Sequence, residues 1–203
     1  MRRKPTQARS QERVNRILET AEKLFIADGY EATTTNAIAQ QSKVSIGSLY
    51  QFFPDKSALL LALAIRYGDL LQQRLVALST HEAAQSSLPV YGEQLIDATA
   101  QFFADYPGYQ AVFMEAQSIE PKIGEIEDAC DAQVVSALAA VLSQRDSHLV
   151  SEDYDAIAFV LVKAIGTVLW LSLKEQPAFQ QRLITETKRL TSAYLKSYQQ
   201  QDK

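Results

Sequence analysis

Apolar side chains recur at intervals of three and four residues along almost the whole chain, which is the spacing of one face of an α-helix. The alternation of single apolar and polar residues that is typical of half-buried strands is almost absent. The pattern is clearest before Gly29, where one face consists of Val14, Ile17, Leu18, Ala21, Leu24 and Phe25. The sequence therefore predicts an all-α protein of about nine helices.

Residues that start and stop helices divide the chain into these elements. Gly29 suits the left-handed position that follows a helix end, and hydroxyl or carboxylate side chains suit helix starts. These signals predict a short helix capped by Thr34 or Thr35, a second capped by Ser45 that ends at Phe52, and a long helix capped by Asp55 that runs from Lys56 to about Leu78. After a polar connection at 79–89, further helices are expected to end at Pro107, to start near Tyr109 and Pro121, to run from Ser151 to Leu173, and to follow Pro177.

The segment "VSIGSLYQFFPDK" (residues 44–56) is unusual for a helical chain, because small side chains stand where charges are expected. Two short helices joined by a tight turn, after a longer helix, fit a helix-turn-helix unit. Small residues at the start of its second helix would let the backbone approach base edges and phosphates. Leu49 and Phe53 are expected to face inward, and Tyr50 and Gln51 to face outward.

The charge distribution points the same way. The net charge is −4, yet the chain up to Lys56 holds nine Lys and Arg against six acidic residues, whereas the remainder holds eleven against eighteen. A basic first quarter on an acidic body suggests that one end of the protein meets a polyanion.

The stretch "GYEATTTNAIAQQSKVSIGSLYQFFPDKSALL" resembles the DNA-binding region of TetR-family transcriptional regulators, and the resemblance covers residues 10–63. It implies phosphate contacts by Thr34 or Thr35, Tyr50 and Lys56, and base contacts by Ser45, Ile46, Gly47, Ser48 and Gln51. Lys43 departs from the family pattern, since a glycine usually occupies this turn. A left-handed conformation there would cost about 1 kcal/mol.

The resemblance also implies two domains, a DNA-binding domain at 1–55 and a ligand-binding and dimerisation domain at 56–203, with 56–78 as the linking helix. A homodimer is expected through the last two helices, at about 152–174 and 178–198, because they carry much apolar surface. The spacing in the last helix predicts a seam of Phe179, Leu183, Thr187, Leu190, Tyr194 and Tyr198. The alternative is that both helices close the core of a monomer.

Aromatic residues gather around the helix break in "QFFADYPGYQAVFMEAQ" (residues 101–117), which suits either a small-molecule pocket or an ordinary core. Lys163, within an apolar helix, needs a partner: Glu115, another acid, an anionic ligand, or solvent reached by its flexible stem. The candidate ligand-binding residues are Phe102, Phe103, Tyr106, Phe113, Glu115, Lys163 and Trp170.

Together these features predict a cytoplasmic regulator, most simply a repressor that binds a pseudo-palindromic operator as a homodimer and is released by an unknown small-molecule inducer. The alternatives are an activator, a ligand-independent DNA-binding protein, or a helical carrier or enzyme with a relic helix-turn-helix. No catalytic set, cofactor motif or metal-ligand spacing is visible, and a single cysteine suits a reducing compartment. The apolar run 156–173 contains Lys163 and is expected to be a buried helix, not a membrane span.

Overall fold

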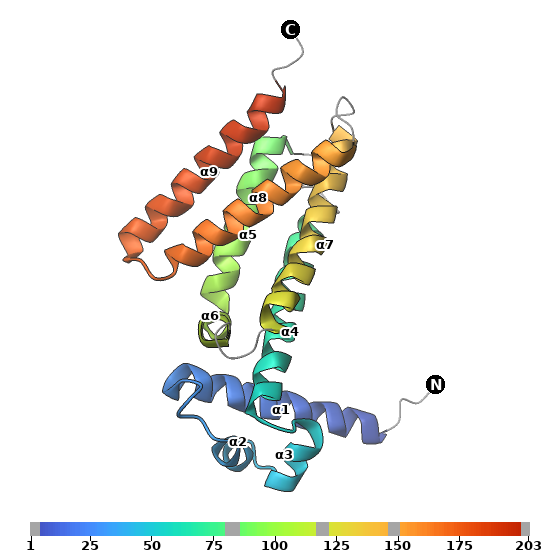
Figure 1. Cartoon of the computed structure of the whole chain (residues 1–203), viewed down its shortest axis with the longest axis vertical. Coiled ribbons are helices and arrows are strands. Elements are labelled where there is room, and N and C mark those ends of the chain that lie inside the picture. The colour runs from blue at the N-terminus through green and yellow to red at the C-terminus, as the bar shows by residue number, and fades with distance from the viewer. Residues whose placement is uncertain (1–4, 80–85, 117–121, 146–150, 200–203) are drawn as a thin grey trace. The chain divides into compact units, whose positions relative to one another are not determined.

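The computed structural model describes residues 5–79, 86–116, 122–145 and 151–199 (Figure 1). Within these ranges the chain forms nine α-helices and no strand, which confirms the predicted all-α fold. The helices are α1 (Pro5–Asp28), α2 (Thr35–Gln41), α3 (Ile46–Phe52), α4 (Lys56–Ser79), α5 (Leu88–Asp105), α6 (Pro107–Ala116), α7 (Lys122–Arg145), α8 (Ser151–Ser172) and α9 (Pro177–Gln199).

Contacts between residues divide the chain into two compact units. The first comprises Met1–Gly68 and Tyr106–Ile126, and the second comprises Asp69–Asp105 and Glu127–Lys203. Helix α4 therefore contributes to both units, and α6 belongs to the same unit as α1, α2 and α3. The functional division after residue 55 that the sequence suggests remains a prediction.

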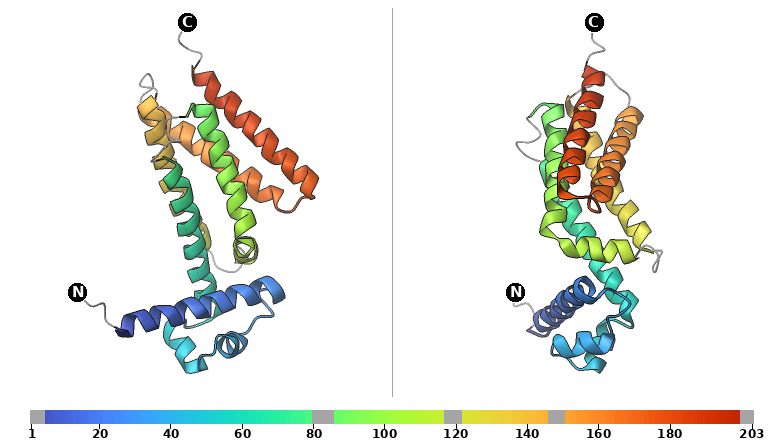
Figure 2. Two further views of the ribbon diagram at one scale, coloured as in Figure 1. Left: turned by 180° about the vertical axis from the view of Figure 1, so that it is seen from behind. Right: turned by 90° about the vertical axis from the view of Figure 1, so that its left-hand side faces the viewer.

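The apolar face of α1 forms the core of the first unit. Its residues from Ile17 to Phe25 are buried as the spacing predicts, and α1 contacts α2, which in turn contacts α3. Figure 2 shows α2 and α3 lying together on one side of α1. Buried side chains from the two short helices, among them Ile38 and Leu49, complete this core. Burial of this face, rather than intrinsic helix propensity, stabilises two helices that are too short to form alone.

The predicted caps fix where the short helices begin. The side-chain oxygens of Thr34 and Ser45 accept hydrogen bonds from the amides of Ala37 and Ser48, at 3.1 and 3.2 Å. Asp55 Oδ1 accepts from the Ala58 amide at 2.7 Å at the start of α4. Each cap satisfies an amide that has no partner within its own helix, which is worth about 1 kcal/mol.

Two of the described residues in the first unit have a left-handed backbone. Gly29 has φ of 80° after the end of α1, as predicted, and Lys43 has φ of 56° in the turn between α2 and α3. Glycine adopts this conformation without strain, whereas lysine does so at a cost of about 1–2 kcal/mol. The turn of the helix-turn-helix is therefore held by its surroundings and not by the preference of Lys43.

Helix α6 packs on α1 through a close approach at Gly108. A Cβ atom there would lie 2.0 Å from Tyr67 Oη and 2.8 Å from Glu22 Oε1. Tyr67 Oη donates to Glu22 Oε1 at 2.6 Å, and both burial and this bond raise the pKa of the phenol. Only glycine leaves room for the Tyr67–Glu22 pair beside α6.

The second unit is built on mutual contacts of α5, α8 and α9. Its core is apolar, and Tyr91, Ile96, Leu138, Ala158 and Leu169 are among its most deeply buried members. By length and composition alone, residues 153–172 form a helix that could cross a membrane. In the structure this helix buries one face against the rest of the unit while its opposite face is exposed.

Candidate DNA-binding surface and effector region

Helix α3 turns one face into the core and the other to solvent. Leu49 and Phe53 are buried, as their spacing predicts. Tyr50 is 48% exposed and Gln51 is also exposed, which confirms their expected direction. At the start of the helix Ser45, Ile46 and Gly47 are exposed and Ser48 is half-buried.

Hydroxyl groups on this surface are joined by hydrogen bonds. Ser45 Oγ donates to Ser48 Oγ at 2.9 Å, in addition to its capping role. Thr35 Oγ1 and Tyr50 Oη share a hydrogen bond of 3.1 Å, which ties the first residue of α2 to the middle of α3. A single shared bond leaves one of these two O–H groups free to donate elsewhere. The pair is thus pre-positioned to donate to an acceptor outside the protein.

Gly47 has a different surrounding from Gly108. A Cβ atom on Gly47 would meet no atom within 4 Å outside its own helix neighbours, and its φ is not in the left-handed region. Glycine inside a helix is destabilising by about 0.5–1 kcal/mol relative to alanine. Neither packing nor backbone conformation therefore explains glycine here, and its stability cost is uncompensated within the protein.

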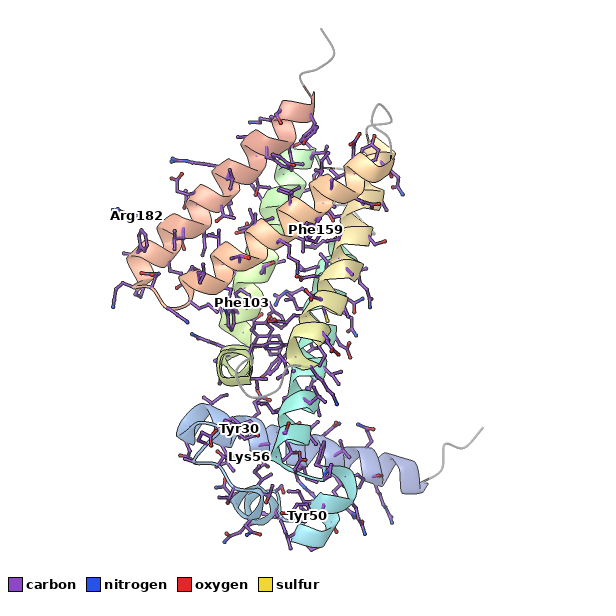
Figure 3. All side chains as sticks on the ribbon, viewed as in Figure 1. Tyr30, Tyr50, Lys56, Phe103, Phe159 and Arg182 are labelled. Atoms are coloured by element: carbon purple, nitrogen blue, oxygen red, sulfur yellow. The ribbon has the colours of Figure 1, made fainter. Side chains whose placement is uncertain are left out.

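Lys56, a predicted phosphate contact, is engaged within the protein. Its Nζ donates to the backbone oxygens of Tyr30 at 2.5 Å and Glu31 at 3.2 Å, and it lies 4.1 Å from the centre of the Tyr30 ring. In Figure 3 Lys56 and Tyr30 lie together, while Tyr50 projects from α3. The phosphate contact stays a prediction.

The candidate ligand-binding residues fall in both units. Tyr106 and Phe113 belong to the first unit, where Phe113 is buried and stacks on Tyr109 at 4.4 Å between ring centres. Phe102, Phe103, Lys163 and Trp170 belong to the second, where Phe103 meets Trp170 edge-on at 6.3 Å. The side chain of Glu115 lies outside the described residues.

Lys163 pairs with two aspartates of α7. Its Nζ lies 2.7 Å from Asp131 Oδ2 and 3.1 Å from Asp128 Oδ1. The hydrogen bond to Asp131 is the largest cause of the raised pKa of Lys163. Of the four partners that the sequence left open, another acid is the one observed.

The outer faces of α8 and α9 expose large apolar side chains. Leu171 is 55% and Leu190 is 59% exposed, and Phe159, Val160 and Phe179 are exposed as well. Phe179, Leu183 and Leu190 share one side of α9 by helical spacing. Three members of the predicted seam depart from it: Thr187 is buried, and Tyr194 and Tyr198 pack against the unit's own core.

Three residues of the first unit form a contact that the sequence does not predict. Glu22, Tyr67 and Gly108 form one contact although they come from three helices far apart in the chain. The only local signal was a glycine after Pro107, which equally suits a helix stop. Among the described residues, no group of three or more His, Cys, Asp or Glu side chains is placed to hold a metal ion.

Two family domains match this chain. Residues 17–63 match the N-terminal domain described as "Bacterial regulatory proteins, tetR family", and residues 87–195 match the domain described as "Tetracyclin repressor-like, C-terminal domain". The first match contains α2, α3 and the caps described above, and the second contains α5, α8 and most of α9.

Curated relatives are similar mainly over part of the chain. An uncharacterized HTH-type transcriptional regulator of Bacillus subtilis, YuxN, is 39% identical over 79 residues, which are 39% of this chain and 26% of that protein. A second from the same organism, YxaF, is 40% identical over 89 residues, 43% of this chain and 45% of that protein. The HTH-type transcriptional repressor KstR of Rhodococcus jostii is 36% identical over 63 residues, 31% of this chain and 30% of that protein. The chain thus spans less than half the length of each of these relatives.

Solved structures are similar over nearly the whole chain. A TetR-family transcriptional regulator from Streptomyces coelicolor has a TM-score of 0.69 at 25% identity, covering 93% of this chain and 98% of its own. The fatty acid degradation regulator FadR from Bacillus halodurans has a TM-score of 0.64 at 13% identity, covering 95% and 97%, and shows the fold alone. By its matched domains and its fold, the chain belongs to the TetR family of helix-turn-helix transcriptional regulators.

Proposed function

We propose that this protein is a repressor that binds a pseudo-palindromic operator as a homodimer and is released from it by a small molecule. The outer surface of α3 supports the proposal that the protein binds DNA, because neither packing nor backbone conformation requires a glycine at Gly47. Members of this family are DNA-binding transcriptional regulators and not enzymes. No turnover of the bound small molecule is therefore expected.

Helix α3 would lie in the major groove, which accepts one α-helix. Gly47 and the serines beside it allow the backbone to approach closely, and Gln51 can form two hydrogen bonds to the edge of adenine. Ile46 suits the methyl group of thymine. Thr34 and Thr35 at the start of α2 and Tyr50 on α3 suit phosphate oxygens, which hydroxyl groups commonly bind.

Homodimerisation would bring two copies of α3 to successive turns of the duplex, about 34–36 Å apart. The exposed apolar faces of α8 and α9 support this part of the proposal, since water penalises such surface in a lone subunit. A four-helix bundle of α8 and α9 from two copies would cover both faces. An interface on this surface would account for the apolar side chains of α8 that do not pack in the core of the second unit.

Repression and release are the remaining parts of the proposal. One relative is described as a repressor and one structural neighbour as a fatty acid degradation regulator, which are properties of those proteins. Phe102, Phe103 and Trp170 supply an aromatic cluster in the second unit that suits an apolar effector. The effector would favour a conformation in which the two copies of α3 no longer match the operator. Action in the cytoplasm agrees with this role.

Selection of bound sequences from random duplex DNA tests the proposal. A dimeric, sequence-specific regulator recovers a pseudo-palindrome, and its affinity falls steeply as salt rises. Gly47→Leu should abolish recovery, because a Cβ atom at this position meets no protein atom within 4 Å and the added side chain would block close approach of α3 to the duplex. Recovery of no common sequence by protein refolded free of bound molecules would contradict the proposal. An operator that overlaps a promoter favours repression, whereas one upstream of it favours activation.

A further inference from the structure

The ammonium group of Lys56, at the start of α4, contacts the connection between α1 and α2. Two of its three N–H donors are directed to the backbone oxygens of Tyr30 and Glu31, and its charge lies over the face of the Tyr30 ring. These carbonyl groups belong to a turn and lie outside the regular hydrogen bonds of a helix. Lys56 thus supplies them with a charged donor, which is a stronger partner than a neutral one.

The same connection is fixed at its other points. Gly29 takes the left-handed conformation, and Thr33 Oγ1 donates to the Gly29 oxygen at 2.8 Å from a buried position. The Tyr30 ring is buried and lies 5.4 Å from the ring of Phe25. Lys56 is a contact that joins this folded turn to α4.

The turn leads directly into the DNA-binding surface. Thr34, the next residue, caps α2, and Thr35 shares its hydrogen bond with Tyr50 of α3. A shift of the turn would move Thr34 and Thr35 together, and it would break or redirect the Thr35–Tyr50 bond. The direction of the free hydroxyl on this surface therefore depends on Lys56, although Lys56 itself points toward the turn.

We propose that Lys56 is a positioning residue for DNA binding in this chain and not a phosphate ligand: it holds the turn at 29–33 so that Thr35 and Tyr50 face the duplex. This inference rests on the proposed function. A phosphate contact would require Lys56 to leave both carbonyl groups and the Tyr30 ring. It acts on the DNA through Thr35 and Tyr50.

The salt dependence of operator binding separates the two roles. Each phosphate contact contributes about 0.9 to the slope of log affinity against log salt, so losing one ligand per half-site lowers the slope by about 1.8 in a dimer. Lys56→Met keeps the apolar stem and removes the charge and the donors. We expect affinity for the selected duplex to fall at least ~10-fold at every salt concentration, with the slope unchanged from wild type. A slope reduced by about 1.8 would overturn the proposal.

Lys23→Met is the matched control, because Lys23 is exposed on α1 in the same unit and loses the same charge. It should leave both affinity and slope close to wild type. Lys56→Arg keeps a charged donor for the turn and should restore most of the affinity.

A double-mutant cycle with Tyr50→Phe tests the route of action. If Lys56 acts through the Thr35–Tyr50 pair, the losses in affinity from Lys56→Met and Tyr50→Phe are less than additive. Fully additive losses would contradict the inference, because a phosphate ligand acts independently of Tyr50.

Two measurements keep the inference testable if Lys56→Met does not fold. In the wild-type protein, the Nζ resonance of Lys56 should keep its chemical shift when operator duplex is added, and a coupling to ³¹P would overturn the proposal. Without DNA, the amides of residues 30–35 should exchange faster in Lys56→Gln than in wild type, because the turn loses its charged donor, and an unchanged rate would also contradict the proposal. A failure to select any duplex would contradict the proposed function itself, and it is distinguished from a failure of the Lys56 proposal because the selection uses the wild-type protein.

Discussion

The outer surface of α3 and the outer faces of α8 and α9 both expose residues that their own unit does not need, but the two surfaces differ in chemistry. On α3 the exposed groups are small or polar: a glycine, hydroxyl groups and an amide. On α8 and α9 they are large and apolar, with Leu171 and Leu190 more than half exposed. The difference indicates which kind of partner each surface suits.

Polar groups on α3 remain hydrated until a polar partner replaces the water, so this surface is compatible with a soluble protein that binds DNA reversibly. Apolar side chains on α8 and α9 gain about 25 cal/mol for each Å² removed from water. They therefore suit a protein surface that stays bound. A stable interface between two proteins buries roughly 1,600 Å² in total, which two long helices from each copy can supply.

The largest predicted effect comes from placing a charge on the apolar surface. The double substitution Leu171→Glu and Leu190→Glu should convert the proposed homodimer to monomer, since four carboxylates would be buried at its interface. Operator affinity should fall by a factor of about 10²–10⁴, because each half-site is then bound by a separate monomer and the gain from linking two DNA-binding domains is lost. Sedimentation velocity and fluorescence anisotropy measure the two quantities.

Gln181→Glu provides the control for this prediction. Gln181 is exposed on the side of α9 opposite Leu190, and its substitution adds the same charge per position. It should leave the protein dimeric. If the Leu171 and Leu190 variant stayed dimeric, α8 and α9 would not be the interface.

A smaller effect, on stability, distinguishes a glycine that packing requires from one that it does not. Gly108→Ala forces a methyl group against the Tyr67–Glu22 pair and should lower the free energy of unfolding by about 1–3 kcal/mol. Gly124→Ala, in α7, meets no atom within 4 Å and should raise it by about 0.5–1 kcal/mol. Urea denaturation of both variants measures the difference. Equal effects would show that the close approach at Gly108 does not constrain the fold.

Substituting Gln51 should change specificity more than overall stability. Gln51→Ala removes an amide suited to adenine, so discrimination at one position of each half-site should fall by about 1–3 kcal/mol while the other positions keep their preference. Competition between single-base variants of the selected duplex measures this. A uniform loss across all sequences would instead indicate that Gln51 contacts the phosphate backbone.

The smallest effect concerns acid stability in the second unit. The hydrogen bond from Arg74, followed by that from Gln101, holds the pKa of Asp105 below its usual value of 3.8. A carboxyl group with a lowered pKa stabilises the folded state above its unfolded pKa, and this contribution disappears as pH falls through the folded pKa. Between about pH 5 and about pH 3, Asp105→Asn should therefore lose less stability than wild type. Parallel urea midpoints at the two pH values test this, and identical losses would contradict it.

Features determined by neighbouring residues could be predicted from the sequence. The spacing of apolar residues in α1 identified its buried face, and hydroxyl residues before α2 and α3 identified their caps, because both signals act within one or two helical turns. The inward direction of Leu49 and the outward direction of Tyr50 followed from the same spacing.

Contacts between distant residues could not be predicted in this way. Long side chains such as Lys56 and Lys163 reach several candidate partners, and only packing decides which one is met. Helical spacing placed Thr187 on one seam with Leu183 and Leu190, but Thr187 is buried on the neighbouring face of α9, which packs on the unit's core, while Leu190 is exposed. Gly108 and Gly47 look alike in the sequence, yet only their surroundings show that one is required by packing.

The central claim is that the outer surface of α3 is shaped for DNA and not for the stability of the fold, and Gly47→Leu tests it most directly. The measurement is the free energy of unfolding together with affinity for the selected duplex, on wild type and variant at one salt concentration. We predict that stability is unchanged or higher by about 0.5–1 kcal/mol, while operator affinity falls at least ~100-fold. Wild-type affinity in a normally folded Gly47→Leu variant would contradict the account.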